Sequence, residues 1–308
     1  MYNEDRKLSF LQETRDSMEY GISLFRATEA LETATDTDLC ELDTEKLESL
    51  YEDSFGTRQR AIDSATALIQ SYVSWCKKNG FPTSDAAFGL DVDISQKIRR
   101  MMVASPMHLA SIMDQVFPPV DSGSVDCIYR CYLWMVFMGI MDVDTVDVMV
   151  NDVDFDDLKV VFGGRGYDLY RESIPAFRLA CTATEFNYVH ENPYYVSVRQ
   201  RFAGDRLIRG VRADHVKIQS IKPYIKKRLT ESGFNLSARR IRLSGIFYKA
   251  YEFERCGLEV NFNDEVMDQF LSKQREFSKN YSRNKAIKMI ERDFQSDYEN
   301  WKRAFCSI

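Results

Sequence analysis

Basic side chains in this chain gather at places where they could hold phosphate groups. One place is the start of a predicted helix, where a threonine hydroxyl, free backbone amides and two guanidinium groups come together at Thr57, Arg58 and Arg60. A helix N-terminus of this composition is a good phosphate seat. Arg165 lies between two glycines, and three arginines cluster within positions 239–242. Phosphate binding is therefore the chemistry to test first.

Other site chemistry fits the sequence less well. The run Gly163-Gly164-Arg165-Gly166 lacks the Lys-Ser/Thr of a P-loop and does not open a helix, so a hairpin turn is the better interpretation. The aspartates between residues 142 and 157 lack calcium-loop spacing. The three histidines, His108, His190 and His215, have no ligand-like spacing. We expect no metal and no cofactor.

Composition and charge describe a soluble globular protein with an uneven charge distribution. The 308 residues carry a net charge of −6. Residues 1–100 carry −7, residues 101–196 carry −9 and residues 197–308 carry +10. A basic last third beside two acidic ones favours an anionic partner, although a solvated basic face would have the same composition. Seven cysteines without framework spacing indicate reduced thiols, and the start of the chain has no signal-peptide pattern. We therefore expect a cytoplasmic protein without membrane contact.

The elements that must position these groups are mostly helices. Residues up to about 81 show only helical periodicity, and the helix predicted over 61–79 has an apolar stripe on one face that runs from Ile62 to Trp75. A very apolar helix is predicted from 127 to about 139. A fresh helix begins after Ser105, so we place a domain boundary near residue 100. Period-2 alternation and a glycine-rich tip predict a β-hairpin from 158–162 and 171–177. Apolar residues at three- and four-residue intervals predict an amphipathic helix over 284–305. The fold class is mainly α with a small antiparallel hairpin or sheet (α+β).

The central part of the chain resembles the catalytic domain of the tyrosine recombinases, the phage integrase family. The resemblance rests on the spacing of five residues: Gly139, Asp144, Asp152, Arg165 and Pro175. It implies a helical, SAM-like core-binding domain at residues 1–100 and a tyrosine-recombinase-like domain at 101–308. The C-terminal helix 284–305 either packs on its own domain or, as the resemblance implies, docks on a neighbouring subunit as a homodimer contact.

The resemblance implies a catalytic centre that has lost most of its charged groups. The family's first arginine falls on Met141, its lysine on Arg165, its histidine on Ile241, its second arginine on Ser244 and its second histidine or tryptophan near Met267. The nucleophile falls near Glu276, and the nearest tyrosine is Tyr281. Because Met and Ser cannot replace guanidinium groups on a phosphoryl transition state, we expect no strand cleavage. A divergent active recombinase that uses Tyr281, Arg165 and Arg242 is the alternative.

A scaffold of this kind grips double-stranded DNA, with phosphate contacts setting position and a few side chains reading bases. The expected DNA contacts are Thr57, Arg58, Arg60, Arg165, Arg209, Arg212, Lys217, Arg239, Arg240, Arg242 and Lys249. The function we expect is that of a sequence-specific DNA-binding regulator of phage or prophage type, associated with the nucleoid of a bacterial cell. A protein-interaction module that has kept the fold and lost DNA binding is a third possibility.

Overall fold

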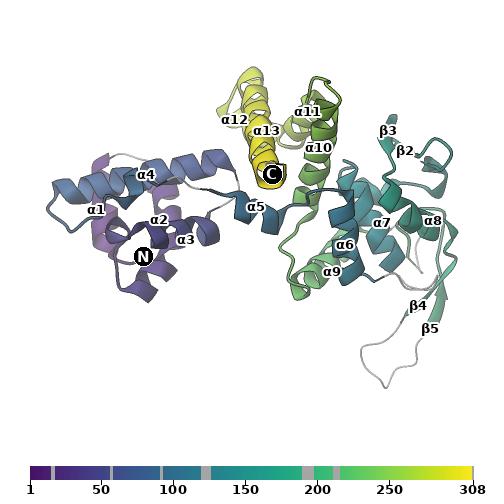
Figure 1. Cartoon of the computed structure of the whole chain (residues 1–308), viewed down its shortest axis with the longest axis horizontal. Helices are drawn as coiled ribbons and strands as arrows, with labels where there is room; N and C mark the ends of the chain where they lie inside the picture. Colours follow the sequence, from purple (N-terminus) through teal and green to yellow (C-terminus); the bar gives the residue numbers. More distant parts are fainter. Residues whose placement is uncertain are drawn as a thin grey trace. The chain divides into compact units, whose positions relative to one another are not determined.

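The computed structural model describes residues 1–14, 18–55, 58–90, 93–118, 126–188, 198–210 and 216–306. They form two compact units (Figure 1). Unit 1 consists of Met1–Ile98 together with Phe262–Ile308, and unit 2 is Arg99–Asn261. The structure thus groups the last segment with the N-terminal helices, whereas the sequence analysis assigned it to the second domain. The two-domain division at residue 100 stays a prediction.

Unit 1 begins with a bundle of helices. Its elements are α1 (Glu4–Thr14), α2 (Met18–Thr35), the 3-10 turn η1 (Leu39–Glu41), α3 (Thr44–Ser54) and α4 (Gln59–Lys78), followed by η2 (Ala86–Phe88). The predicted apolar stripe of α4 is buried from Ile62 to Tyr72. Phe10 and Phe25 pack edge-on against the Tyr72 ring, with centroids 5.2 and 5.1 Å away. The face of α4 that the periodicity predicted is therefore the centre of this bundle.

A buried ionic network ties α1 to α2 inside this bundle. Lys7 and Glu32 are both fully buried, and Lys7 Nζ donates to Glu32 Oε1 at 2.6 Å. The same carboxylate accepts from Thr28 Oγ1 at 2.8 Å and from the backbone amide of Leu39 at 2.7 Å. Because all of these groups have partners, the charges are tolerated in an apolar surrounding.

The last segment of unit 1 contains α11 (Asn263–Ser272), α12 (Gln274–Asn280) and α13 (Arg283–Phe305). The amphipathic helix predicted over 284–305 is confirmed, since Ile290, Phe294, Tyr298 and Trp301 on its apolar stripe are buried. Phe262 packs against Phe294 and Tyr298 with ring centroids 5.8 and 5.6 Å apart. Asn300 Nδ2 donates to Gln59 Oε1 at 3.2 Å, which joins α13 to the start of α4.

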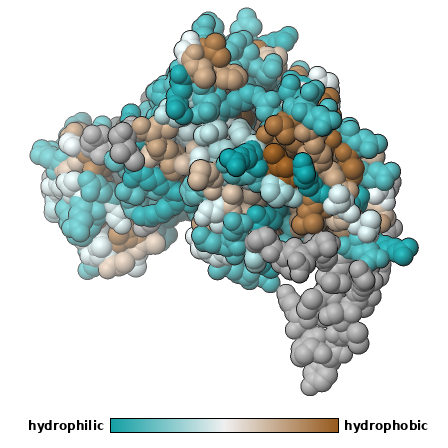
Figure 2. Space-filling view, turned by 45° about the vertical axis from the view of Figure 1, so that its right-hand side comes forward, coloured by the Kyte–Doolittle hydropathy of each residue, from teal (hydrophilic) through white to brown (hydrophobic). Residues whose placement is uncertain are grey.

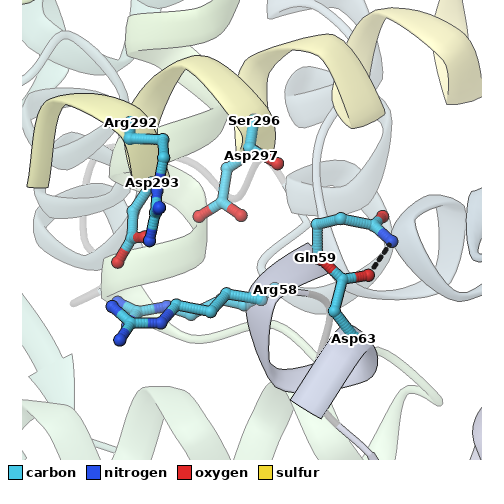
Figure 3. Close-up of a pocket in the computed structure, with 8 residues that line it drawn as sticks. Arg58, Gln59, Asp63, Arg292, Asp293, Ser296 and Asp297 are labelled. Atoms are coloured by element: carbon cyan, nitrogen blue, oxygen red, sulfur yellow. Dashed lines mark hydrogen bonds between the residues drawn. The ribbon is translucent and has the colours of Figure 1, made fainter. Parts of the chain in front are cut away.

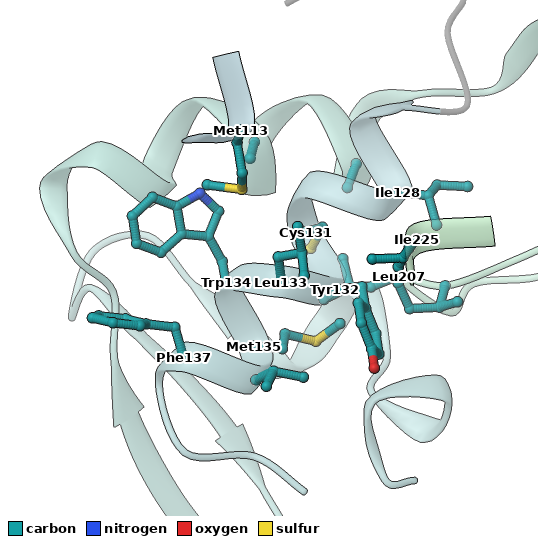
Figure 4. Close-up of a cluster of buried hydrophobic side chains, with 14 of the residues drawn as sticks. Met113, Ile128, Cys131, Tyr132, Leu133, Trp134, Met135, Phe137, Leu207 and Ile225 are labelled. Atoms are coloured by element: carbon teal, nitrogen blue, oxygen red, sulfur yellow. The ribbon is translucent and has the colours of Figure 1, made fainter. Parts of the chain in front are cut away.

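Unit 2 is built around α7 (Asp126–Phe137). Every residue of α7 from Cys131 to Phe137 is buried, and Figure 4 shows these side chains surrounded by other apolar groups. The helices that accompany it are α6 (Pro106–Val116), α8 (Ile174–Thr182), α9 (Ile218–Glu231) and α10 (Ala238–Arg255), and α5 (Ser95–Met101) runs across the boundary between the units. A helix that is apolar on all sides must be covered on all sides. The very apolar helix that the sequence predicted here is therefore the core of unit 2.

The close approach of α10 to α7 requires a glycine. A Cβ atom built on Gly245 would lie 1.6 Å from the carbonyl oxygen of Phe137. Gly245 therefore lets the middle of α10 touch the C-terminal end of α7, where the chain turns through Gly139 with a positive φ of 107°. This approach sets the position of every side chain on α10 relative to α7.

The predicted hairpin exists, but its second strand lies earlier in the chain. The strands β1 (Val153–Asp154), β2 (Lys159–Phe162) and β3 (Arg165–Asp168) form an antiparallel sheet in that order. Phe162 pairs with Arg165 across a two-residue turn in which Gly163 and Gly164 have positive φ, the conformation that tight hairpins favour. The expectation of a strand over 171–177 is wrong: η5 (Arg171–Ser173) leads into α8, because Pro175 has no amide for a strand ladder and suits a first helical turn.

A second, two-stranded sheet pairs β4 (Glu185–Tyr188) with β5 (Val198–Arg201) in unit 2. Figure 2 shows a surface that is largely hydrophilic, with hydrophobic patches interrupted by polar groups. No helix in the described part of the chain is long and apolar enough to cross a membrane.

Candidate DNA-binding surface and degenerate catalytic centre

Ser244, to which the resemblance assigns the second catalytic arginine, is a buried serine bonded within its own unit. Ser244 lies on α10 with no exposed surface. Its hydroxyl accepts a hydrogen bond from the backbone amide of Val103 at 2.9 Å and donates to the carbonyl of Arg240 at 2.7 Å. Both hydrogen-bonding functions of this hydroxyl are used within unit 2. Nothing at this position can offer a positive charge to a phosphate.

The other two changed positions of unit 2 are apolar. Ile241, one helical turn before Ser244, is fully buried in the hydrophobic core. Met141 is half-buried in the turn after α7, where its carbonyl accepts from the amide of Asp144 at 2.9 Å. The resemblance requires an imidazole at position 241 and a guanidinium group at position 141. Instead, the side chain of Ile241 is a hydrocarbon and that of Met141 is a thioether.

Arg242 holds α10 to the turn that follows α7. Its Nε donates to the carbonyl oxygen of Gly139 at 2.8 Å, and the side chain is half-buried. This hydrogen bond fixes the guanidinium group against the backbone of the turn. Arg242 stays among the expected DNA contacts, with a structural function added.

Arg165 and Lys249 lie on elements that a salt bridge connects. Arg165 is exposed at the start of β3. Lys249 Nζ, on α10, lies 3.3 Å from Asp168 Oδ2 at the end of β3. Because this pair is exposed on both sides, it orients the side chains more than it stabilises the fold. The hairpin and α10 thus present basic groups from neighbouring elements.

The start of α10 carries two more of the expected contacts. Arg239 is exposed and Arg240 is half-buried, with Nη1 donating to the carbonyl of Asn235 at 3.3 Å. Burial, and then the neighbouring positive charge of Arg239, lower the pKa of Arg240. A cation that repels its neighbour in this way is better accommodated when an anion binds between them.

Arg209, one of the expected DNA contacts, is mostly buried in unit 2, and its contact with DNA stays a prediction. Arg209 is only 9% exposed, and its Nη2 donates to the carbonyl oxygens of Ala180 and Ala183. Its guanidinium also lies over the Phe202 ring, 5.3 Å from the centroid. Three carbonyl groups, with Gly204 as the third at 3.3 Å, take up donors that phosphate would need. Arg209 thus connects the segment that follows β5 to the C-terminal end of α8.

Two of the expected DNA contacts, Thr57 and Arg212, lie outside the described residues. Lys217 is exposed at the N-terminal boundary of α9. Met267, half-buried on α11, and Tyr281, half-buried at the end of α12, belong to unit 1. Lys285 Nζ lies 5.2 Å from the centroid of the Tyr281 ring. The other four catalytic positions belong to unit 2, so the positions fall into two separate sets.

In unit 1, Arg58 and Arg60 line a polar cavity of about 300 Å³. Figure 3 shows Arg58, at the start of α4, and Asp297, on α13, pointing into this cavity. The remaining lining residues are Gln59, Asp63, Arg292, Asp293 and Ser296. Three arginines and three aspartates make the cavity electrically balanced. The predicted phosphate seat therefore lies beside carboxylates of the C-terminal helix.

Among the residues that the structure describes, no three His, Cys, Asp or Glu side chains lie close enough together to hold a metal ion. The acidic run after α7 instead contributes to turns: Asp152 Oδ2 accepts from the amide of Met149 at 2.8 Å, and Asp154 Oδ1 accepts from two amides at 2.9 Å. The interpretation of these aspartates as turn and capping residues fits their contacts.

Comparison with known proteins bears on the N-terminal part of the chain. A family model described as the MrpR N-terminal core-binding domain, a domain of the phage integrase family, matches residues 1–78. A search of curated proteins found no match. The predicted fold class is confirmed: the protein is mainly helical with a small antiparallel sheet, and it contains a core-binding domain. The match supports the predicted resemblance of the chain to the integrase family and suggests DNA as a partner.

Sequence reasoning missed a set of basic and aromatic residues around a second cavity, in unit 2. Lys222 and Lys226, on α9, line this cavity together with Tyr132 on α7. In the sequence, the basic residues of α9 are part of the general excess of positive charge over residues 197–308. Tyr132 lies within an apolar stretch of sequence, which gives no sign that its hydroxyl is buried with no hydrogen-bond partner among the residues that the structure describes.

Proposed function

We propose that this protein is a sequence-specific, double-stranded DNA-binding regulator built on an integrase scaffold that no longer cuts DNA. The observation that carries the DNA-binding part is the core-binding domain match at residues 1–78. The basic groups of α10 and the β2–β3 hairpin supply a second set of phosphate contacts on unit 2. The protein works in the cytoplasm of a bacterial cell, associated with the nucleoid.

The lack of cleavage rests on the three positions of unit 2 that have changed type. Ile241 and Ser244 are buried and Met141 is half-buried, so none can meet a phosphoryl oxygen with positive charge. Removal of one electrostatic stabiliser typically costs about 10²–10³ in rate. Such losses need not multiply, but here the groups are replaced together. Arg165 and Arg242 alone keep the charge that the alternative, a divergent recombinase, requires.

Within the integrase family, the proposed function is that of a repressor of the kind that SPβ-type prophages use. This finer assignment comes from the resemblance of the sequence, in which a recombinase scaffold has lost its catalytic groups. A regulator of this kind needs tight, salt-sensitive and sequence-dependent binding, and it does not need a nucleophile.

Two measurements test the proposal. Purified protein is first titrated with genomic fragments at several salt concentrations, and we expect selective binding whose affinity falls steeply with salt. The selected duplex is then prepared as a nicked suicide substrate, which traps a covalent intermediate if one forms. We expect no adduct from the natural chain or from Tyr281→Phe. An adduct that disappears in Tyr281→Phe would establish the divergent recombinase, and binding to no duplex at all would establish the interaction module.

The homodimer through 284–305 is a separate proposal. In unit 1 the apolar stripe of α13 is buried against α11 and α4. In a dimer that uses the same stripe, α13 of one chain would therefore have to pack on α11 and α4 of the other chain. Light scattering of the natural chain and of Trp301→Glu tests this: a mass of two chains that falls to one in the variant supports the exchange.

A further inference from the structure

The second cavity, in unit 2, has the composition of a ligand site. It measures about 280 Å³ and lies between α7, α9 and the start of α10. Its walls are apolar, with Leu133, Ile225 and Leu229 among the lining residues. Figure 4 shows Ile225 and Tyr132 in the same buried cluster. Small-molecule sites in proteins are typically concave and apolar, with a few convergent polar groups.

Charge at this cavity is unbalanced toward the positive. Lys222, Lys226 and Arg239 line it, and Asp142 is its one acidic lining residue. Asp142 forms a salt bridge with Lys222, so three basic side chains and a single carboxylate line the cavity. The N-terminal end of α10 also lines the cavity, and a helix N-terminus favours an anion.

A buried hydroxyl supplies an independent indication. Tyr132 is 1% exposed, and its hydroxyl has no hydrogen-bond partner among the described residues. Burial, and then the negative charge of Asp142, raise the pKa of this phenol, which keeps it protonated and able to donate. A buried polar group without a partner is uncommon in proteins and indicates a missing ligand or water.

We propose that this cavity binds a small amphipathic anion, whose apolar part lies against Ile225 and Leu229 and whose carboxylate or phosphate head meets Lys226 and the start of α10. Because Arg239 belongs both to this cavity and to the expected DNA contacts, an anion bound here removes positive charge from the DNA-binding surface. Occupancy therefore weakens duplex binding. This second part, and only this part, rests on the proposed function.

Calorimetric titration of the full chain with octanoate tests the site directly. Octyltrimethylammonium, with the same tail and the opposite charge, is the matched ligand. Lys226→Glu and Lys227→Glu are the matched variants: both residues are exposed on α9, but only Lys226 lines the cavity. We expect saturable octanoate binding that Lys226→Glu weakens by about fivefold and Lys227→Glu leaves within twofold, with unchanged melting temperatures.

Equal binding of the two ligands, equal effects of the two variants, or no binding of octanoate would each overturn the site. Duplex affinity is then measured with and without saturating octanoate, and we expect it to fall in the natural chain and to change less in Lys226→Glu. The calorimetric arm contains no DNA. A chain that binds octanoate but no duplex would therefore support the cavity and overturn the proposed function.

Discussion

The hydroxyl of Ser244 accepts a hydrogen bond from the backbone amide of Val103 at 2.9 Å, across 141 residues of sequence. This bond fixes the segment that precedes α6 against the middle of α10. The same position is where the resemblance to the recombinases requires a guanidinium group directed at DNA. Where an active recombinase would have an arginine that contacts the DNA phosphate, this protein has a serine that forms hydrogen bonds inside unit 2.

Ser244→Ala tests this structural function. The substitution removes the hydroxyl that accepts from the buried amide of Val103, so we expect a loss of about 1–3 kcal/mol in the free energy of unfolding. Urea denaturation gives this value, with Ser278→Ala, an exposed serine on α12, as the control. Duplex affinity at a temperature where both proteins are folded should not change. A large loss of affinity at full stability would show that Ser244 contacts DNA after all.

Gly245→Ala tests the contact between α10 and α7. Alanine is better than glycine in a helix by about 1 kcal/mol when nothing obstructs it. Here the added Cβ would lie 1.6 Å from the Phe137 carbonyl oxygen, so we expect a net destabilisation of about 3 kcal/mol or more. The control is Gly89→Ala, where no atom lies within 4 Å and φ is −106°; its effect should stay within about 0.5 kcal/mol. Similar melting temperatures for the two variants would contradict the packing described for α10.

Lys7→Met tests the buried pair inside unit 1. The substitution leaves the Glu32 carboxylate buried without its counter-ion, which typically costs about 3–5 kcal/mol. Addition of Glu32→Gln should recover part of the loss, because the amide removes the buried charge and still offers an oxygen to the Leu39 amide. Denaturation of the single and double variants measures this coupling. Additive effects would mean that the two side chains do not interact.

Asp38→Asn tests the response to acid. Burial alone would raise the pKa of Asp38, but hydrogen bonds from Asn3 and Cys40 and the charge of Lys7 outweigh it, and the pKa lies below its ordinary value. A carboxylate with a lowered folded pKa stabilises the protein above its unfolded pKa, about 3.9, and this contribution is lost as pH falls through the folded pKa. We expect Asp38→Asn to destabilise at pH 7 and to approach the natural chain in acid. Asp85→Asn, at an exposed pair with Lys77, is the control, and a constant difference at all pH values would contradict the prediction.

Arg239→Ala with Arg240→Ala tests the DNA-binding surface of α10. Each phosphate contact that is lost should reduce the slope of log affinity against log salt by about one. Because Arg240 is already half-buried and bonded to Asn235, we expect a reduction between one and two. Lys227→Ala with Arg255→Ala removes the same charge at exposed positions outside the predicted set. Equal slopes for the two double variants would show that only net charge matters.

Periodicity was enough to predict the long elements. The apolar stripes of α4 and α13 and the very apolar C-terminal part of α7 appear where the sequence predicted them, because such residues are stable only when they are buried. The glycine pair 163–164 correctly marked a hairpin tip. The second strand was predicted too late in the chain, because the residue alternation at 171–177 resembles that of a strand. In the structure a two-residue turn makes the second strand begin at Arg165.

The candidate site was less predictable, because side-chain contacts between distant segments decide it. Arg209 and Arg239 are both arginines of the basic last third of the chain. In the structure, Arg209 is buried in unit 2 and donates to backbone carbonyls, whereas Arg239 is exposed. Likewise, Asp43 caps α3 by accepting from the Lys46 amide, although Thr44 was an equally good capping residue by type. Residue type alone does not separate a structural cation from a binding cation.

The assignment of Phe262–Ile308 to unit 1 also bears on how the chain assembles. A ribosome makes all of Arg99–Asn261 before it makes α13, so unit 2 has its complete sequence while the α4 face that receives α13 is still uncovered. During synthesis, therefore, all of unit 2 has been made while unit 1 still lacks its last helices. At this stage a chaperone or a second nascent chain could bind the exposed face of α4.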